Sequence, residues 1–143
     1  MNVASILREK GRDVLVTQPD RSLKEAAAQL AARGVGAVVV SDAAMNVLGI
    51  LSERDIVRAI GGRGASALDD PVSRHMTREV TTVAEEATIE DAMAMMTEGR
   101  FRHLPVIESG RLVGIVSIGD VVKRHVEAID GERRVLRDYI ASA

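Results

Sequence analysis

The sequence predicts a mixed α/β (α+β) protein of two β-α-β-β-α units that pack sheet to sheet around a pseudo-twofold axis, followed by a C-terminal helix. The first observation is an internal repeat: residues 14–40 correspond to residues 80–106 at a shift of 66 positions (80 − 14 = 66). The second is that both copies alternate β-rich runs with helical periodicity in the same order. The third is size, because one unit alone is too small to cover all its apolar faces.

The first copy opens with a short β-rich run at residues 14–17 and a polar turn. Ser22 is a candidate helix N-cap, and Glu25 three residues later completes the sequence pattern of a capping box. The helix that follows is predicted to end at Gly34. Its apolar residues recur at helical spacing, at Leu23, Ala26, Ala27 and Leu30.

Two strands and a second helix complete the first copy. The strands are predicted at residues 37–41 and 47–51, with a turn around Asn46 between them. Both are almost continuously apolar, as expected when helices cover one face of a sheet and a second sheet covers the other. The second helix is predicted to begin at Ser52.

The second copy follows the same order. Thr88 is the corresponding N-cap candidate, and Asp91 makes a weaker version of the capping box. Gly99 is predicted to end this helix, and the next hairpin turns at Ser109-Gly110. The predicted strands lie at 80–83, 103–107 and 112–116, and the second helix begins at Ser117.

Two segments lie outside the duplication. Residues 61–66 are rich in glycine and are predicted to form a mobile loop between the copies. An amphipathic helix is predicted from about Glu132 to Ile140, packed either on its own body or on a second subunit. The predicted division is a first repeat with its N-terminal helix at 1–62, a linker at 63–71, a second repeat at 72–128 and a C-terminal helix at 129–143.

Composition excludes several functional classes. The formal net charge of the 143 residues is −2 and no basic stripe is present, which argues against nucleic acid as a partner. The absence of cysteine excludes disulfides and cysteine zinc sites, and the three histidines are not spaced as metal ligands, so no metal is expected. Charges interrupt the N-terminus too early for a signal peptide, and no apolar run is long enough to cross a membrane. We therefore expect a cytoplasmic protein without membrane contact.

A serine and an aspartate three residues later occupy the same place in both copies. Ser52 with Asp55, and Ser117 with Asp120, lie where a strand gives way to a helix. The free N–H groups of a helix N-terminus attract an anion such as phosphate, and a carboxylate on the same face can accept hydrogen bonds from a ribose diol. The same spacing is also an ordinary helix cap that needs no ligand, and both interpretations remain open at this point.

Several segments, taken in order, resemble the CBS-domain family. They are Gly-Ile-Leu-Ser-Glu-Arg-Asp at 49–55, Gly-Ile-Val-Ser-Ile-Gly-Asp at 114–120, the stretch 72–83 with its Met-Thr and Val-Thr-Thr-Val pattern, and Arg-His-Leu-Pro-Val at 102–106. The resemblance covers roughly residues 3–126. It implies a tandem pair of CBS domains that binds adenosine compounds between its repeats: AMP, ADP or ATP, and in some members NAD(H) or S-adenosylmethionine.

The resemblance also implies roles for individual residues. Asp55 and Asp120 would hold ribose, while Ser52 and Ser117 would contact the ribose or the phosphate end of the ligand. Each cleft of the family is lined by residues of both repeats. By that rule the residues near Asp55 are Thr81, Phe101 and Arg102, and those near Asp120 are Leu15, Gly36 and Ala37.

The two clefts are not expected to be equal. Arg54 precedes Asp55, whereas Gly119 precedes Asp120, and Arg102 and His103 stand where the first copy has Gly36 and Ala37. Because charge-assisted bonds to phosphate are strong, one cleft should bind polyphosphate more tightly than the other. Alternatives remain open: Phe101 as a core residue, Arg54 paired with an acid across a dimer contact, and His103 as a strand residue without a ligand role.

These observations favour a regulatory module over an enzyme. No nucleophile is paired with a base in the sequence, so no catalytic residue is predicted. We expect a sensor that binds an adenosine compound, forms a homodimer through exposed helix faces and signals to a regulated partner protein. The alternative is a structural adaptor dimer with empty clefts, although two uncompensated carboxylates would then only cost stability.

Overall fold

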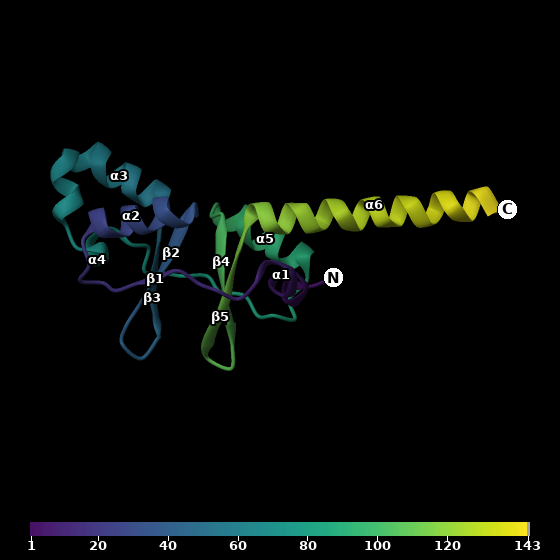
Figure 1. The fold of residues 1–143 in the computed structure, drawn as a ribbon, viewed down its shortest axis with the longest axis horizontal. Coiled ribbons are helices and arrows are strands. Elements are labelled where there is room, and N and C mark those ends of the chain that lie inside the picture. The colour runs from purple at the N-terminus through teal and green to yellow at the C-terminus, as the bar shows by residue number, and fades with distance from the viewer. Residues whose placement is uncertain (143) are drawn as a thin grey trace.

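The computed structural model describes residues 1–142 and consists of two small sheets, each with its own helices (Figure 1). The first half contains β1 (Val16–Thr17), α2 (Leu23–Arg33), β2 (Ala37–Ser41), β3 (Val47–Ser52) and α3 (Glu53–Arg63), with its strands in the order β1-β2-β3. The second half contains α5 (Ile89–Gly99), β4 (His103–Glu108), β5 (Arg111–Ser117) and α6 (Ile118–Ser142). The predicted fold class is confirmed.

Each half has its own apolar core. In the first half, Leu23 and Leu30 of α2 pack with Val38 and Val40 of β2. Alternation along the strand turns Val39 to the opposite face, and Val39 is also fully buried. Both faces of β2 are therefore covered, which is why the strand reads as an uninterrupted apolar run.

The N-terminal helix α1 (Val3–Lys10) packs on the second half, although the sequence places it with residues 1–62. Its residues Val3, Ile6 and Leu7 belong to the same core as Leu104 and Val116. The short helix α4 (Val72–His75) makes the reciprocal crossing, because Val72 and Met76 join the core of the first half. The two halves therefore exchange their N-terminal segments.

Two glycines make this exchange possible. A Cβ on Gly114 of β5 would lie 2.6 Å from a methyl group of Leu7, and a Cβ on Gly49 of β3 would lie 2.8 Å from the sulfur of Met76. Leu7 and Met76 are thus equivalent residues of the two copies, at a shift of 69 positions (76 − 7 = 69). The bare backbone of each glycine lets a crossing segment lie directly on the sheet.

The predicted strand at 80–83 is wrong. Only Val83 pairs with β4, through a single parallel bridge to Val106, whereas β1 forms a two-residue ladder with β2. In the first half the N–H of Val39 donates to Leu15 O. The residue that corresponds to Val39 is Pro105, which has no N–H to donate, and the second ladder stops after one residue.

The details of the helix ends also differ from the prediction. Thr88 and Asp91 form the complete capping box, while Ser22 receives the N–H of Glu25 without a reciprocal bond. Glu25 pairs instead with Arg21, at 3.4 Å. At the C-terminus of α5 the left-handed residue is Arg100, with φ 56°, so the helix runs through Gly99. Arg100 is the counterpart of Gly34, with φ 62°, at the shift of 66 positions (100 − 34 = 66).

The predicted mobile loop at residues 61–66 is helical. The helix α3 continues to Arg63, and a 3₁₀ segment, η1 (Gly64–Asp69), begins at Gly64, whose φ is 71°. The Arg63 guanidinium donates two hydrogen bonds to the carboxylate of Asp70, which also bonds His75 at 2.7 Å. These bonds fix the connection between the two halves.

The C-terminal helix is not a separate element. α6 is one helix of 25 residues that begins at the second copy and runs on to Ser142. Its final turns project away from the rest of the chain (Figure 1). Within residues 1–142, none of the helices combines the length and the apolar character needed to cross a bilayer.

Candidate functional site

The turn from β3 into α3 holds Ser52 and Asp55 in a closed hydrogen-bonded ring. The N–H and the hydroxyl of Ser52 both donate to Oδ2 of Asp55, at 2.9 and 3.1 Å, and the N–H of Asp55 donates back to the Ser52 hydroxyl at 3.3 Å. This is a full capping box, so the cap interpretation is correct for the Oδ2 atom. No bond within residues 1–142 involves Oδ1 of Asp55, which leaves that atom available to a ligand.

The turn from β5 into α6 repeats this geometry at Ser117 and Asp120. The Ser117 N–H donates to Oδ2 of Asp120 at 2.9 Å, and the Asp120 N–H donates to the Ser117 hydroxyl at 3.1 Å. Here a third group is present. The ammonium of Lys10 lies 2.6 Å from Oδ2 of Asp120 and also donates to the carbonyl of Ile115 at 2.9 Å.

The contact with Lys10 helps to lower the pKa of the Asp120 carboxyl group. Burial by itself would raise the pKa of Asp120, but the hydrogen bonds from Lys10 and from the Ser117 N–H outweigh it and hold the pKa below its ordinary value. Asp120 is therefore ionised at neutral pH and already carries a cationic partner. Lys10 binds Oδ2, while Oδ1 of Asp120, like Oδ1 of Asp55, takes part in no bond within residues 1–142.

The exchange of N-terminal segments explains why only one carboxylate is paired. Lys10 reaches Asp120 because α1 crosses to the second half. At the shift of 69 positions that relates Leu7 to Met76, the counterpart of Lys10 is Glu79 (79 − 10 = 69). The chain thus places an acid in the first half where the second half has a lysine, and Asp55 makes no ion pair within the described part of the chain.

A cavity of about 310 Å³ lies between the two halves, and three arginines line it. Arg54 comes from α3, whereas Arg100 and Arg102 flank Phe101 in the segment before β4; the remaining lining residues are Met96, Thr97 and Ile118. Within residues 1–142 none of the three guanidinium groups forms an ion pair. Unpaired charges of one sign around a cavity favour an anion with several oxygen atoms.

His103 of the second half lies close to Gly36 and Glu53 of the first half. A Cβ on Gly36 would lie 2.5 Å from a carboxylate oxygen of Glu53 and 3.3 Å from Cε1 of His103, so these three residues of the two halves meet. Burial, followed by the positive charge of Lys10, lowers the pKa of His103. The neutral form of the imidazole is therefore favoured at pH 7.

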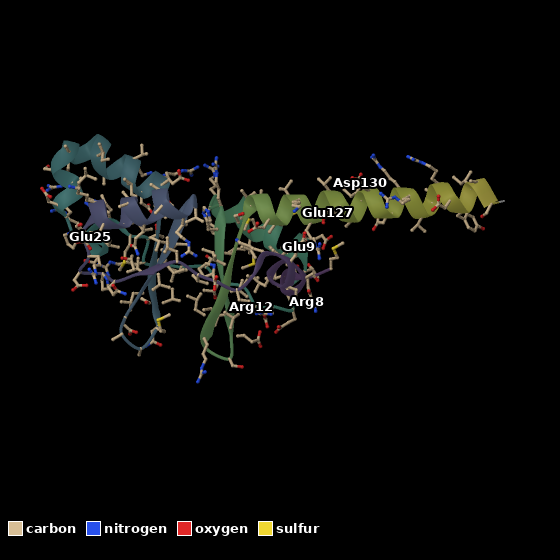
Figure 2. All side chains as sticks on the ribbon, in the orientation of Figure 1. Arg8, Glu9, Arg12, Glu25, Glu127 and Asp130 are labelled. Carbon is tan, nitrogen blue, oxygen red and sulfur yellow. The ribbon has the colours of Figure 1, made fainter. Side chains whose placement is uncertain are left out.

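A second cavity, of about 340 Å³, lies between α1 and α6 next to Asp120. It is lined by Ile6, Glu9, Lys10, Asp120, Lys123, Arg124 and Glu127. The guanidinium of Arg124 bonds Glu9 at 2.6 Å and Glu127 at 3.2 Å, and Figure 2 shows both glutamates where α1 lies beside α6. Its charged groups are thus largely neutralised by one another, in contrast to the arginine cavity.

The structure brings some of the predicted residues together and leaves others apart. Arg54, Phe101 and Arg102 share one cavity, although they come from different halves. Phe101 also packs against the second core, in agreement with its interpretation as a core residue. Leu15 packs on the first core, Ala37 is buried, and Thr81 is exposed and lines neither cavity.

Three residues that sequence reasoning missed are Lys10, Glu53 and Arg100. Lys10 carries no local signal, because its role depends on where α1 packs. Arg100 could have been found from the repeat, since it stands opposite the left-handed Gly34 and next to Phe101 and Arg102. Across residues 1–142, no group of three acidic or histidine side chains is arranged to hold a metal ion.

Comparison with known proteins defines the class of protein. The model of the CBS domain matches the chain twice, at residues 3–62 and 72–127. A CBS-domain-containing protein from Agrobacterium tumefaciens has a crystal structure that matches with a TM-score of 0.86 and 51% identity, over 87% of this chain and 99% of that one. The chain belongs to the CBS-domain family, as a tandem pair of CBS domains.

Further relatives extend across distant organisms. A mitochondrial CBS-domain-containing protein of Arabidopsis thaliana is 35% identical, and the match covers 96% of this chain and 71% of that protein. A CBS domain protein from Pyrobaculum aerophilum, whose structure is a complex with AMP, matches with a TM-score of 0.75 and 28% identity, over 84% of this chain and 89% of that one. Proteins of the family are generally regulatory modules.

Proposed function

We propose that this protein is a regulatory module that binds an adenosine-containing nucleotide between its two repeats and signals the occupancy to a partner protein. The observation that carries the proposal is the pair of Ser-x-x-Asp turns, together with a cavity between the halves that three arginines line and to which Arg54, the neighbour of Asp55, contributes. The relative from Pyrobaculum aerophilum, which has the same fold and was solved with AMP, supports the adenosine class.

The Asp55 cleft is the principal site in this proposal. Asp55 would hold the ribose through Oδ1, with Ser52 beside it, while Thr81 and Phe101 would lie near the adenine. Arg54 and Arg102 would bind the phosphates, and Arg100 joins them from the same cavity wall. Three guanidinium groups exceed what one phosphate requires, so a ligand with two or more phosphates, ADP, ATP or NAD(H), is favoured over AMP or S-adenosylmethionine.

The Asp120 cleft would be the weaker site. Its serine and aspartate have the same geometry as those of the first cleft, with Leu15, Gly36 and Ala37 expected near the base. The ion pair with Lys10 at Oδ2 neutralises part of the charge of this carboxylate, which weakens the hydrogen bonds that its Oδ1 could accept from ribose. His103, which lies near both clefts, would sense the occupancy of either one.

The signal follows from the position of the principal cavity. Its lining comes from α3 of the first half and from the start of β4 in the second, so a bound nucleotide contacts both halves. A ligand shifts the equilibrium between two arrangements of the halves only as far as its affinities for those two arrangements differ. The partner would read that arrangement, in the cytoplasm, from a homodimer assembled through exposed helix faces.

The test is a calorimetric titration of AMP, ADP, ATP and NAD(H) into the wild type, Asp55→Ala and Asp120→Ala. A hydrogen bond to a charged group contributes about 1.5–3 kcal/mol, so Asp55→Ala should weaken the principal site roughly ten- to a hundredfold. Asp55→Asn is the matched control for the cap, because it keeps an oxygen for the Ser52 N–H. Absence of heat with every ligand would favour the adaptor with empty clefts, and ligand turnover would indicate an enzyme.

A further inference from the structure

The last four turns of α6 carry large apolar side chains that nothing in residues 1–142 covers. Leu136, Tyr139 and Ile140 are 60%, 72% and 66% exposed, and Val135 is 71% exposed. The segment lies beyond the second match to the CBS domain, which ends at residue 127. Because most helical stability in proteins comes from packing of an apolar face, contact with a partner surface would stabilise these turns.

The apolar residues of α6 follow a heptad repeat. Val122, Ile129 and Leu136 are seven residues apart and take the d positions. Val126 and Ile140 take a positions, and the a position between them is Arg133. Val122, Val126 and Ile129 are 42%, 49% and 37% exposed, so the stripe begins on the body of the protein and continues, interrupted at Arg133, to Ile140. Alternation of three and four residues is the spacing of a two-stranded coiled coil.

The charges beside this stripe fit a second copy of the same helix. In a parallel pair, a g residue faces the e residue five positions later on the other helix. Glu132 at g then faces Arg137 at e, with opposite charges, and His125 at g faces Asp130. Arg133 lies beside the same glutamate of the other helix. One polar a residue is the usual device that fixes register and a two-stranded state.

We propose that residues 122–140 of α6 form a parallel two-stranded coiled coil with the same residues of a second copy of this chain. The Leu136 side chains of the two copies then face each other in one d layer. Two symmetric Glu132–Arg137 pairs flank that layer. This interface does not depend on nucleotide binding, and it joins the two CBS pairs by a rigid rod that can transmit a change in their arrangement.

The chain contains no cysteine, so a single introduced thiol reports directly on this geometry. In the proposed d layer the Cα atoms of residue 136 fall within the range of roughly 4.4–6.8 Å that a disulfide spans. Leu136→Cys should therefore oxidise to a covalent dimer, seen on a non-reducing gel, at micromolar protein. Asp138→Cys, on the opposite face of the same helix, is the matched control and should stay mostly monomeric on the gel.

A charge exchange tests the register independently. Glu132→Arg alone should weaken dimerisation up to about fivefold, because two surface ion pairs contribute together roughly 1 kcal/mol. Glu132→Arg combined with Arg137→Glu should restore it, as measured by sedimentation equilibrium. Equal cross-linking of Leu136→Cys and Asp138→Cys would overturn the proposal. So would cross-linking of Leu136→Cys to a cysteine at position 133 instead of to itself, which indicates antiparallel helices.

Discussion

The two halves of this protein share one fold and one turn motif, but their aspartates are in different electrostatic states. Asp55 closes a capping box and makes no ion pair within residues 1–142, while Asp120 closes the same box and binds Lys10 at 2.6 Å. The difference comes from a segment far away in the sequence, because α1 crosses to the second half. Duplicated motifs therefore do not guarantee duplicated sites, since each motif takes its neighbours from the other copy.

The largest effect is expected from shortening a buried side chain of α1, because the packing of α1 on the second half is what brings Lys10 to Asp120. Leu7→Ala should lower the free energy of unfolding by about 2–5 kcal/mol, because Leu7 is fully buried against Gly114 and the second core. Met76→Ala, the counterpart in the first half, should also destabilise. Urea unfolding measures both, and Arg8→Ala, on the exposed side of α1, should change stability by no more than about 0.5 kcal/mol. A small effect of Leu7→Ala would mean that α1 does not pack on the second half.

The next largest effect is expected from removing a positive charge from the arginine cavity. Arg102→Gln should weaken ATP binding about ten- to a hundredfold and AMP binding less, because its bond to phosphate is charge-assisted. Arg58→Gln, an exposed residue on the same helix as Arg54, is the control and should leave both affinities unchanged. Calorimetry with the two nucleotides gives the ratio. Equal losses for AMP and ATP would contradict a polyphosphate preference.

A smaller effect is expected from a substitution that makes the two clefts more alike. Lys10→Met frees the Asp120 carboxylate, and ligand affinity at the second cleft should rise up to about fivefold, since a partly exposed ion pair contributes no more than about 1 kcal/mol. Lys123→Met, which lines the same cavity but pairs with Glu9, is the control. An unchanged number of sites and unchanged affinities in calorimetry would show that Lys10 does not limit the second cleft.

The smallest effect is a pH dependence carried by His103. The pKa of His103 is lower in the folded protein than the ordinary histidine value of 6.5, so the folded state favours the neutral imidazole. Stability from this group is fully present above pH 6.5 and is lost as the pH falls through the lower folded pKa. The melting temperature should therefore fall between pH 7.5 and 5.5, and His103→Gln should reduce the slope while His125→Gln keeps it. An identical slope in His103→Gln would exclude this residue as the cause.

Much of the fold could be predicted from local patterns. The repeat, the apolar strands at 37–41 and 103–107 and the caps at Ser22 and Thr88 are properties of short segments, and the structure contains them. The predicted strand at 80–83 failed because its partner strand carries Pro105, an effect of pairing and not of the segment itself. The predicted loop at 61–66 failed because the ion pairs of Asp70 hold a glycine-rich segment in helical form.

The amino-acid sequence by itself determined the two CBS repeats and the Ser-x-x-Asp turns, because these depend on propensities and spacings within a few residues. Only the tertiary structure decided which carboxylate carries an ion pair, since Lys10 and Asp120 are brought together by packing across 110 positions. The same holds for the three arginines around one cavity and for the bare face of α6. Long-range packing sets which charges meet, and no local pattern encodes it.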